Sequence, residues 1–478
     1  MKDFLSWQQM SPVWYRRVVI KPHAKEAHVK GRVSILGGMY MSEYADITIR
    51  KLSLWWFRNY LNNDIVSLFF SEGDLFITAE HMHDLEDDEF GEYTRYMYKT
   101  TVKRAKERFD ALGYGISNLE KVFDENILQA IDYSEFLHHL NVAYDDYEEV
   151  AQDRIKKRVS FKKWKNAMKK IITYELQHGN IRWTEKMPCI STECEKVIFY
   201  SLNDSDVESF YALFPEVIPE PYVFRLILES CADDDEIILD FSNLENWAED
   251  CISKALSAAG NIEKTIVLVE GTSDKEILEY SLKMLYPHLS DLFYFMDFGD
   301  DYGAKREGGT SYVIKNLKTF YFSKLNTKFI AIFDNDAEGY QSKCALLTEI
   351  KNWPDNFRIL LYPENKLFHK YPTLAPNGKI IMDNINKKAC SIELYLPDSI
   401  IKEDGKFSPI EWEARKKIRN IDGNEEALYQ GVITQKDDIK KKFHKLRKAI
   451  DKGEKEFVDE EWLRMKQLLD AIVFAFAK

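Results

Sequence analysis

The clearest pattern in the chain is an alternation of short apolar runs with longer amphipathic stretches, which begins after Asn261. The apolar runs are rich in β-branched and aromatic residues and are predicted to be strands, and the stretches between them are predicted to be helices. The predicted strands are residues 265–269, 292–297, 329–333 and 358–362, and the predicted helices are residues 273–285, 311–325 and 337–350. Such an alternation is typical of a parallel sheet flanked by helices.

Residues 1–92 show a different pattern, in which short β-branched runs recur between glycine, proline and acidic segments. This pattern predicts a β-rich lobe. The predicted strands are residues 16–22, 32–41, 44–49, 64–70 and 74–80, and an acidic loop is expected at residues 83–92.

Helical patterns dominate residues 93–260 and the C-terminal part of the chain. Amphipathic stretches at 94–114 and 161–179 have a glycine at or near their ends, where helices commonly stop. Residues 401–478 are also predicted to form a helical segment. Its helices are expected at 410–421, 436–453 and 462–477. The predicted order is therefore a β-rich lobe, a mainly helical region, an α/β domain at 261–400 and a helical C-terminal segment.

The composition adds limits to this picture. With 478 residues, of which 45% are hydrophobic, the chain is long and apolar enough for about three folded domains. No apolar stretch approaches the roughly 20 residues that cross a bilayer, so a soluble cytoplasmic protein without membrane contact is expected. The six cysteines are scattered, and Cys189 and Cys194 have no second close pair to complete a zinc site. Reduced thiols are therefore expected.

The formal net charge of −13 argues against an unspecific coat of nucleic acid and favours local basic patches. One basic cluster at residues 154–170 surrounds Trp164, and its candidates for nucleic-acid contact are Lys162, Lys163 and Trp164. A solvated helix face is the simpler interpretation of this cluster. A second candidate is the glycine-rich loop with Lys305 and Arg306, which precedes a predicted helix and could cradle a phosphate. A plain flexible loop is the equal alternative.

Three acidic residues directly follow predicted strands. Glu270 follows the strand at 265–269, and Asp334 follows the strand at 329–333, with Asp336 two positions further on. Ligands of open parallel sheets bind beyond the carboxyl ends of the strands. Several carboxylates at one rim of a sheet are tolerable only when a cation neutralises them. The sequence therefore predicts a metal site at Glu270, Asp334 and Asp336.

The segment after Glu270 has the form of a capping box, in which Ser273 caps a helix and Asp274 lies in its first turn. Two interpretations of Asp274 stay open, a favourable charge at the helix N-terminus and a further metal ligand. Gly271 and Gly339 are expected to allow sharp turns next to the acidic residues.

At these residues the sequence resembles the Toprim family, which type IA and type II topoisomerases, bacterial primases and OLD-like nucleases share. VEGTSDKEIL at 269–278 is similar to its glutamate motif, and IFDNDAEG at 332–339 is similar to its DxDxxG motif. The resemblance implies an α/β Toprim domain with a Rossmann-like parallel sheet. It also implies that Glu270 is a catalytic acid or base that touches metal, and that Asp334 and Asp336 bind metal.

The same resemblance extends to later residues. Glu393, in SIELYLP, lies near the position where OLD-like nucleases carry another acidic residue, and Ser391 is expected to cap that helix. The active-site lysine of OLD-like enzymes corresponds to Lys436 or Lys440, and the choice between them stays open. Glu338 is interpreted as an acid in a helix first turn rather than as a ligand. The implied cofactor is Mg²⁺ or Mn²⁺, which both suit all-oxygen ligation.

MSEYADITI at 41–49 and the helical block behind it resemble the N-terminal region of bacterial HEPN/Toprim-associated proteins. The HEPN ribonuclease motif needs an Arg and a His on one helix, whereas Arg16 and Arg17 precede His23 in a strand-like run. A HEPN-like region without a ribonuclease site is therefore expected.

The function that the resemblance implies is a metal-dependent nuclease that hydrolyses phosphodiester bonds, with DNA expected ahead of RNA, in bacterial defence against phage. A primase- or topoisomerase-related enzyme and a regulatory nucleic-acid-binding Toprim module are the alternatives. No GxxxxGK[ST] motif occurs in the chain, so an ATPase or another defence-system partner would be a separate chain. Association of identical copies also stays open.

Overall fold

The computed structural model describes residues 44–83, 90–130, 160–178, 218–246, 250–296, 309–419 and 422–477. These residues belong to one compact unit that starts at Ser42. The predicted strands at 16–22 and 32–41 lie outside the described residues, together with Arg16, Arg17 and His23.

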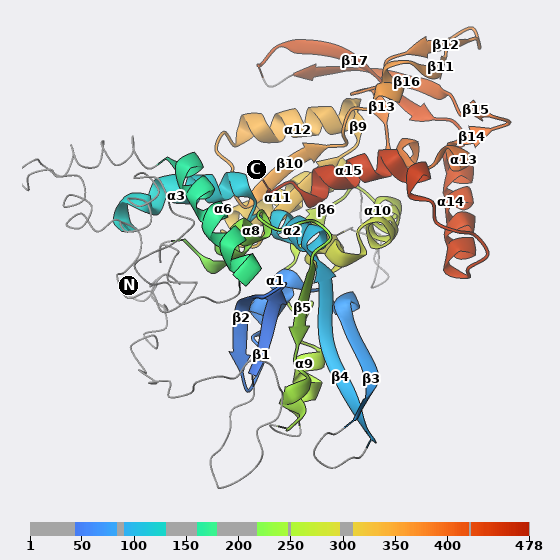
Figure 1. The fold of residues 1–478 in the computed structure, drawn as a ribbon. Helices are drawn as coiled ribbons and strands as arrows, with labels where there is room; N and C mark the ends of the chain where they lie inside the picture. Colours follow the sequence, from blue (N-terminus) through green and yellow to red (C-terminus); the bar gives the residue numbers. More distant parts are fainter. Residues whose placement is uncertain are drawn as a thin grey trace, which may run out of the picture. The chain divides into compact units, whose positions relative to one another are not determined.

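The front of the described chain is an antiparallel sheet with the strand order β2–β1–β5–β4–β3 (Figure 1). Its strands are β1 (Tyr44–Ile49), β2 (Leu52–Arg58), β3 (Leu75–His83), β4 (Phe90–Thr101) and β5 (Glu236–Asp240). Along β1, Ala45, Ile47 and Ile49 are buried and the residues between them are more accessible, which is the period of two that a strand with one buried face shows. The strands predicted at 44–49 and 74–80 are confirmed.

The strand predicted at 64–70 is wrong, because this segment forms helix α1 (Asn63–Phe69). The Asn62 side chain accepts hydrogen bonds from the backbone N–H groups of Asp64 and Ile65, and so caps the helix. The run of apolar residues was compatible with either structure, and the cap decides for a helix.

The helix predicted at 94–114 is wrong in its first half. Residues 94–101 belong to β4, which pairs with β3 on one side and with β5 on the other. Helix α2 (Val102–Ala111) begins only after Thr101, whose hydroxyl accepts a hydrogen bond from the Arg104 N–H. The pairing with β5 joins residues far apart in sequence, so no local pattern predicts it.

Further helices belong to the front half. They are η2 (Glu72–Asp74), α3 (Ile116–Ala130), α6 (Phe161–His178), α8 (Glu220–Leu228), η4 (Ser242–Asn246) and α9 (Cys251–Leu256). The helix predicted at 161–179 is confirmed by α6. Among the helices of the described ranges, none has the length and apolar character that a membrane span requires.

The parallel sheet predicted after Asn261 is confirmed, with the strand order β10–β8–β6–β7. Its elements are β6 (Thr265–Leu268), α10 (Thr272–Leu285), η5 (Pro287–Leu292), β7 (Phe293–Met296), α11 (Thr310–Phe322), β8 (Phe329–Phe333), α12 (Ala337–Glu349) and β10 (Phe357–Leu361). Strand β8 is buried at every position, as expected of a central strand covered on both faces.

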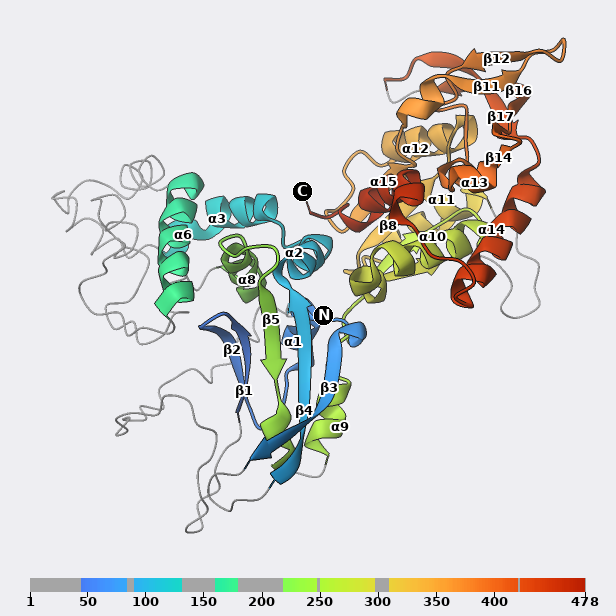
Figure 2. The same cartoon turned by 45° about the vertical axis from the view of Figure 1, so that its right-hand side comes forward.

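The prediction that residues 401–478 are helical is wrong for most of residues 402–433. The segment IEWEARKKIR forms strand β16 (Ile410–Arg419), which pairs with β17 (Glu425–Ile433) in a long hairpin. Charged residues follow one another in the RKK and EE runs of these segments, so the sequence lacks the alternation of apolar and polar residues by which a half-buried strand is predicted. Figure 2 shows this hairpin beside α12, and the two are in contact.

The remaining elements surround this hairpin and the parallel sheet. They are β9 (Asn335–Asp336), η6 (Lys366–His369), β11 (Tyr371–Leu374), β12 (Ile380–Asp383), β13 (Ala389–Cys390), η7 (Ile392–Tyr395), α13 (Asp398–Ile401), β14 (Lys402–Glu403), β15 (Lys406–Phe407), α14 (Lys436–Asp451), η8 (Asp459–Trp462) and α15 (Leu463–Val473). The helices predicted at 436–453 and 462–477 are confirmed by α14 and α15.

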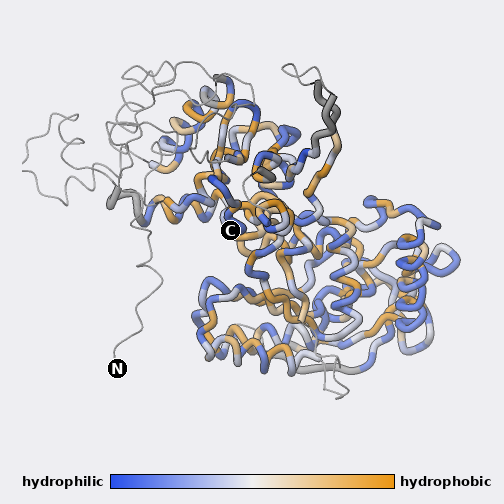
Figure 3. The backbone as a smooth tube through the Cα atoms, turned by 90° about the horizontal axis from the view of Figure 1, so that it is seen from below, coloured by the Kyte–Doolittle hydropathy of each residue, from blue (hydrophilic) through white to orange (hydrophobic). Residues whose placement is uncertain are grey.

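The front sheet and the parallel sheet share one hydrophobic core, which runs from Ile47 in β1 to Leu469 in α15. Along the helices, hydrophobic and hydrophilic positions alternate within single turns (Figure 3), as amphipathic helices on a core require. Arg108 of α2 is 1% exposed and forms a bidentate ion pair with Asp291, at 2.6 Å for each bond. It also donates to the carbonyl of His288. The buried guanidinium therefore ties the front half to the parallel-sheet region.

Candidate metal centre

The carboxyl ends of β6 and β8 bring Glu270 and Asp334 together. The two strands are adjacent and parallel, so their ends meet at one edge of the sheet. Asp334 follows β8 directly, and its backbone N–H donates to Oε1 of Glu270 at 3.1 Å. Glu270 and Asp334, which the sequence predicted to lie close together, are therefore in direct contact.

Asp334 has one enclosed carboxylate oxygen. Within the described part of the chain, its Oδ1 is buried and has no hydrogen-bond partner. Burial raises the pKa of Asp334 well above its ordinary range, and the charges of Glu270, Asp274 and Asp336 raise it further. A buried oxygen without a partner is costly unless a proton or a cation satisfies it.

The neighbouring acids show the same effect. Burial raises the pKa of Glu270 to about 8, and the charges of Asp336, Asp274 and Glu338 contribute to this rise. The hydrogen bond from the Asp334 backbone lowers the pKa but does not offset the rise. Burial and the charge of Glu393 raise the pKa of Asp274 to about 6. Carboxyl groups that resist ionisation together are typical of a site built to hold a proton or a cation.

Asp336 is held by two hydrogen bonds at the start of α12. Its Oδ1 accepts from the Gly339 N–H at 2.7 Å and caps the helix, and its Oδ2 accepts from Nε2 of Gln430 at 2.6 Å. A Cβ on Gly339 would lie 2.1 Å from the Asp334 carbonyl oxygen, so close approach explains this glycine rather than a left-handed turn. Oε1 of Gln430 accepts from the Glu338 N–H. No sequence motif identified Gln430, which comes from β17.

Asp274 lies in the first turn of α10, as predicted, but the capping box is wrong. The helix starts at Thr272 with Gly271 at its cap, and Ser273 is inside the helix. The Ser273 hydroxyl instead accepts a hydrogen bond from Nζ of Lys440 at 2.9 Å. Oδ1 of Asp274 accepts from the Tyr362 hydroxyl at 3.3 Å.

Glu393 connects the acidic group to α14. It is 1% exposed, and its Oε1 lies 3.5 Å from Nζ of Lys436 and 3.6 Å from Nζ of Lys440. Oε2 accepts from the Ser391 hydroxyl at 2.6 Å. Ser391 therefore does not cap its helix with its side chain, as expected from sequence, but orients the carboxylate. Both candidate lysines lie at the centre.

The donor set fits a hard divalent cation, because all of its members offer oxygen. In the ranges that the structure describes, no three His, Cys, Asp or Glu side chains converge closely enough to hold a metal by themselves. Mg²⁺ usually retains several waters and takes only one or two carboxylates from the protein. Asp334, with its unsatisfied buried oxygen, and the adjacent Glu270 or Asp336 are therefore the residues that would hold it.

The basic cluster around Trp164 does not provide a stacking ring. Trp164 is 1% exposed and packs against Phe123 and Phe161, with ring centroids 4.8 and 6.0 Å away. The prediction of nucleic-acid contact by Trp164 is therefore wrong, because its ring belongs to the core. Lys162 and Lys163 are exposed on α6, as the solvated-face interpretation requires. Lys305 and Arg306 lie outside the described residues.

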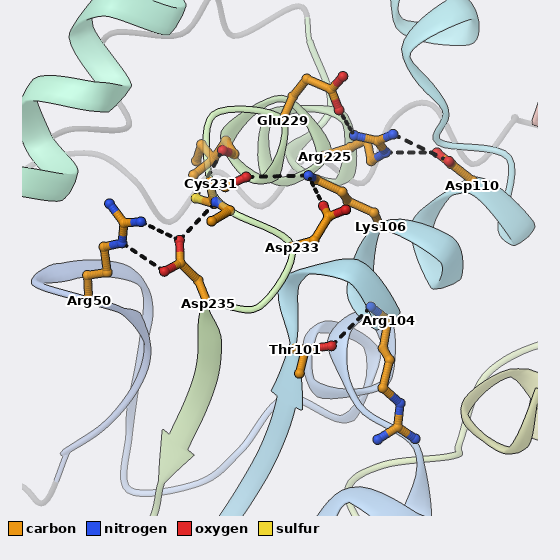
Figure 4. Close-up of polar contacts among 12 residues, drawn as sticks. Arg50, Thr101, Arg104, Lys106, Asp110, Arg225, Glu229, Cys231, Asp233 and Asp235 are labelled. Atoms are coloured by element: carbon orange, nitrogen blue, oxygen red, sulfur yellow. Dashed lines mark hydrogen bonds and ion pairs between the residues drawn. The ribbon is translucent and has the colours of Figure 1, made fainter.

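The acidic run at 233–235 belongs to a network of surface ion pairs in the front half (Figure 4). Asp233 pairs with Lys106 at 2.8 Å, and Asp235 pairs with Arg50 at 2.9 Å. The described cysteines form no disulfide with one another, and Cys189 and Cys194 lie outside the described residues.

One family model matches the chain. The model of HEPN/Toprim N-terminal domain 1 matches residues 41–259, which precede the candidate metal centre. The match supports a HEPN/Toprim-associated protein. Searches of the curated proteins and of the solved structures gave no match.

Proposed function

We propose that this chain is a metal-dependent nuclease of OLD-like character, which hydrolyses phosphodiester bonds of DNA or RNA at a Toprim-type centre. The buried, unpartnered Oδ1 of Asp334 beside Glu270 is the observation that carries this proposal. The order of the parallel strands and the position of both acids at the strand ends support it. A role in bacterial defence against phage rests on the resemblance to HEPN/Toprim-associated proteins.

The residues of the centre divide the chemical work. Mg²⁺ or Mn²⁺, when bound, supplies polarisation of the phosphate and activation of water. Without metal, burial and neighbouring charges raise the pKa of Glu270 to about 8. With a cation held by Asp334 and Asp336, this carboxyl would serve as the acid or base of the reaction. Lys436 and Lys440 place two ammonium groups beside Glu393, where they can attract the phosphates of a substrate.

The test is cleavage of plasmid DNA, linear DNA and tRNA by the full chain with Mg²⁺ or Mn²⁺. Glu270→Gln and Asp334→Asn are expected to lower the rate roughly a hundredfold or more, whereas Glu276→Gln, on an exposed part of α10, is the matched control. Cleavage that both site variants retain would contradict the assignment. Covalent protein–DNA adducts would indicate a topoisomerase instead, and template-dependent incorporation of nucleotides would indicate a primase.

A further inference from the structure

A strip of lysines and aromatic rings borders the candidate metal centre on the side of the β16–β17 hairpin. Its members are Tyr340, Lys387, Lys388, Trp412 and Tyr429, and we call it the aromatic–lysine strip. Nζ of Lys387 lies 5.1 Å from the centre of the Tyr340 ring, and Nζ of Lys388 lies 5.9 Å from that of Trp412. The rings of Trp412 and Tyr429 are 6.1 Å apart. The strip thus consists of two cation–ring pairs, the second of which continues into the Tyr429 ring.

Backbone contacts fix this strip next to the metal centre. Lys388 forms a bridge with Asp336, and its carbonyl accepts a hydrogen bond from the Gly431 N–H at 3.0 Å. Gln430, between Gly431 and Tyr429, holds the Asp336 carboxylate. Because Gln430 and Tyr429 are consecutive in β17, their side chains lie on opposite faces, and the strip borders the centre through the backbone of Lys388 beside Asp336.

The charges of the strip are available to an anion. Lys387 is 44% exposed and reaches Glu364 only at 3.8 Å, and Lys388 reaches Asp383 only at 3.7 Å. Exposed ion pairs at this distance contribute little, so phosphates can replace them. Burial lowers the pKa of the nearby Lys343, and the charge of Lys387 lowers it further, which means that like charges are held together here.

The rings favour an unpaired strand over a duplex. Tyr429 is 50% exposed, and bases can stack on a ring only when they are not enclosed in a double helix. A duplex would meet the lysines alone. Single-strand binding uses neighbouring rings and cations of this kind, because the strand presents both bases and phosphates.

We propose that the aromatic–lysine strip binds single-stranded nucleic acid and leads it to the candidate metal centre. The proposal rests on the proposed nuclease function, since it names the form of nucleic acid that the centre receives.

The test is fluorescence anisotropy of the full chain with labelled oligothymidylate, oligouridylate and a duplex of equal length. EDTA is present, so that binding is measured without cleavage. The Lys387→Gln/Lys388→Gln variant is expected to bind single strands about tenfold more weakly, with a salt slope lower by about 1.4, which is about 0.7 for each lost phosphate contact. Tyr429→Ser is expected to lose about tenfold through stacking.

Two controls separate binding from folding. Lys387→Arg/Lys388→Arg is expected to bind like the wild type, and so is Lys254→Gln, which removes a 75% exposed lysine of α9. Unchanged affinity of the double Gln variant, or preference of the wild type for the duplex, would overturn the proposal.

The same variants assayed for cleavage with Mg²⁺ distinguish the two proposals. Cleavage that does not depend on Lys387 and Lys388 would refute the proposed role of the strip and would not affect the nuclease assignment. Single-strand binding through the strip, in a wild type that cleaves nothing, would support the strip and refute the nuclease assignment.

Discussion

Glu270→Gln should stabilise the metal-free protein, and the gain should grow with pH. In the wild-type fold, burial and the charges of Asp336, Asp274 and Glu338 raise the pKa of Glu270 from 4.5 to about 8. Gln has the same shape and keeps an Oε1 that accepts the hydrogen bond from the Asp334 backbone. The substitution therefore removes the ionisable proton and little else.

The magnitude follows from the linkage between proton binding and folding. Between pH 4.5 and 8 the folded protein holds a proton on Glu270 that the unfolded chain releases, so wild-type stability falls as the pH rises through this window. The difference between pH 7 and the ordinary pKa of 4.5, multiplied by about 1.36 kcal/mol per pH unit, gives a loss of wild-type stability of about 3 kcal/mol at pH 7. The same reasoning gives a cost below about 1 kcal/mol at pH 5. Both are upper limits, because the side chain retains some contact with water.

Urea unfolding in EDTA at pH 5 and pH 7 measures this difference. The variant should exceed the wild type by up to about 3 kcal/mol at pH 7 and by much less at pH 5. Mg²⁺ should narrow the gap at pH 7, because it binds the folded wild type. Glu276→Gln, whose side chain is 43% exposed, should show no such pH dependence. An equal difference at both pH values, or a wild type more stable than the variant at pH 7, would refute the reasoning.

Three further predictions concern other contacts. Glu393→Gln removes the buried carboxylate that pairs with Lys436 and Lys440, and should lower the free energy of unfolding by about 2 kcal/mol. Urea unfolding at neutral pH measures this loss, and an unchanged midpoint would contradict the prediction. Gln430→Ala frees the Asp336 carboxylate and should weaken Mg²⁺ binding roughly tenfold by calorimetry; equal affinity would show that Gln430 does not orient this ligand. Arg108→Met leaves Asp291 and the carbonyls of Ser67 and His288 without their donor and should lower the free energy of unfolding by about 3 kcal/mol. Asp291→Leu introduced with it should recover part of this loss, and an equal loss in both variants would contradict the reasoning.

The sequence predicted best where a local pattern also decides the structure. The strand before Asp334 is apolar and buried at every position. Both the strand and the position of the acid that follows it could therefore be predicted. The hairpin β16–β17 was missed because charged residues follow one another in its sequence. Strand β4 was missed because its partner β5 is far away in sequence.

The site could be predicted only as far as its motifs reach. Asp334 and Asp336 were found because they follow a buried strand, and Asp334 contacts Glu270 as expected. Gln430 is 94 residues from Asp336, and a single glutamine in a charged strand carries no signal of its own. Whether Lys436 or Lys440 approaches Glu393 could not be chosen from a lysine-rich segment, and both do.

The double use of Asp336 sets the strength of the centre. Its carboxylate caps α12, and the N-terminus of a helix carries about half a positive elementary charge. A cation beside Asp336 would therefore meet attraction from the acids and repulsion from the helix axis, with the latter worth about 0.3–1 kcal/mol. This repulsion would weaken cation binding by at most about fivefold, and the phosphates of a substrate would offset it, so the metal and the nucleic acid should bind cooperatively.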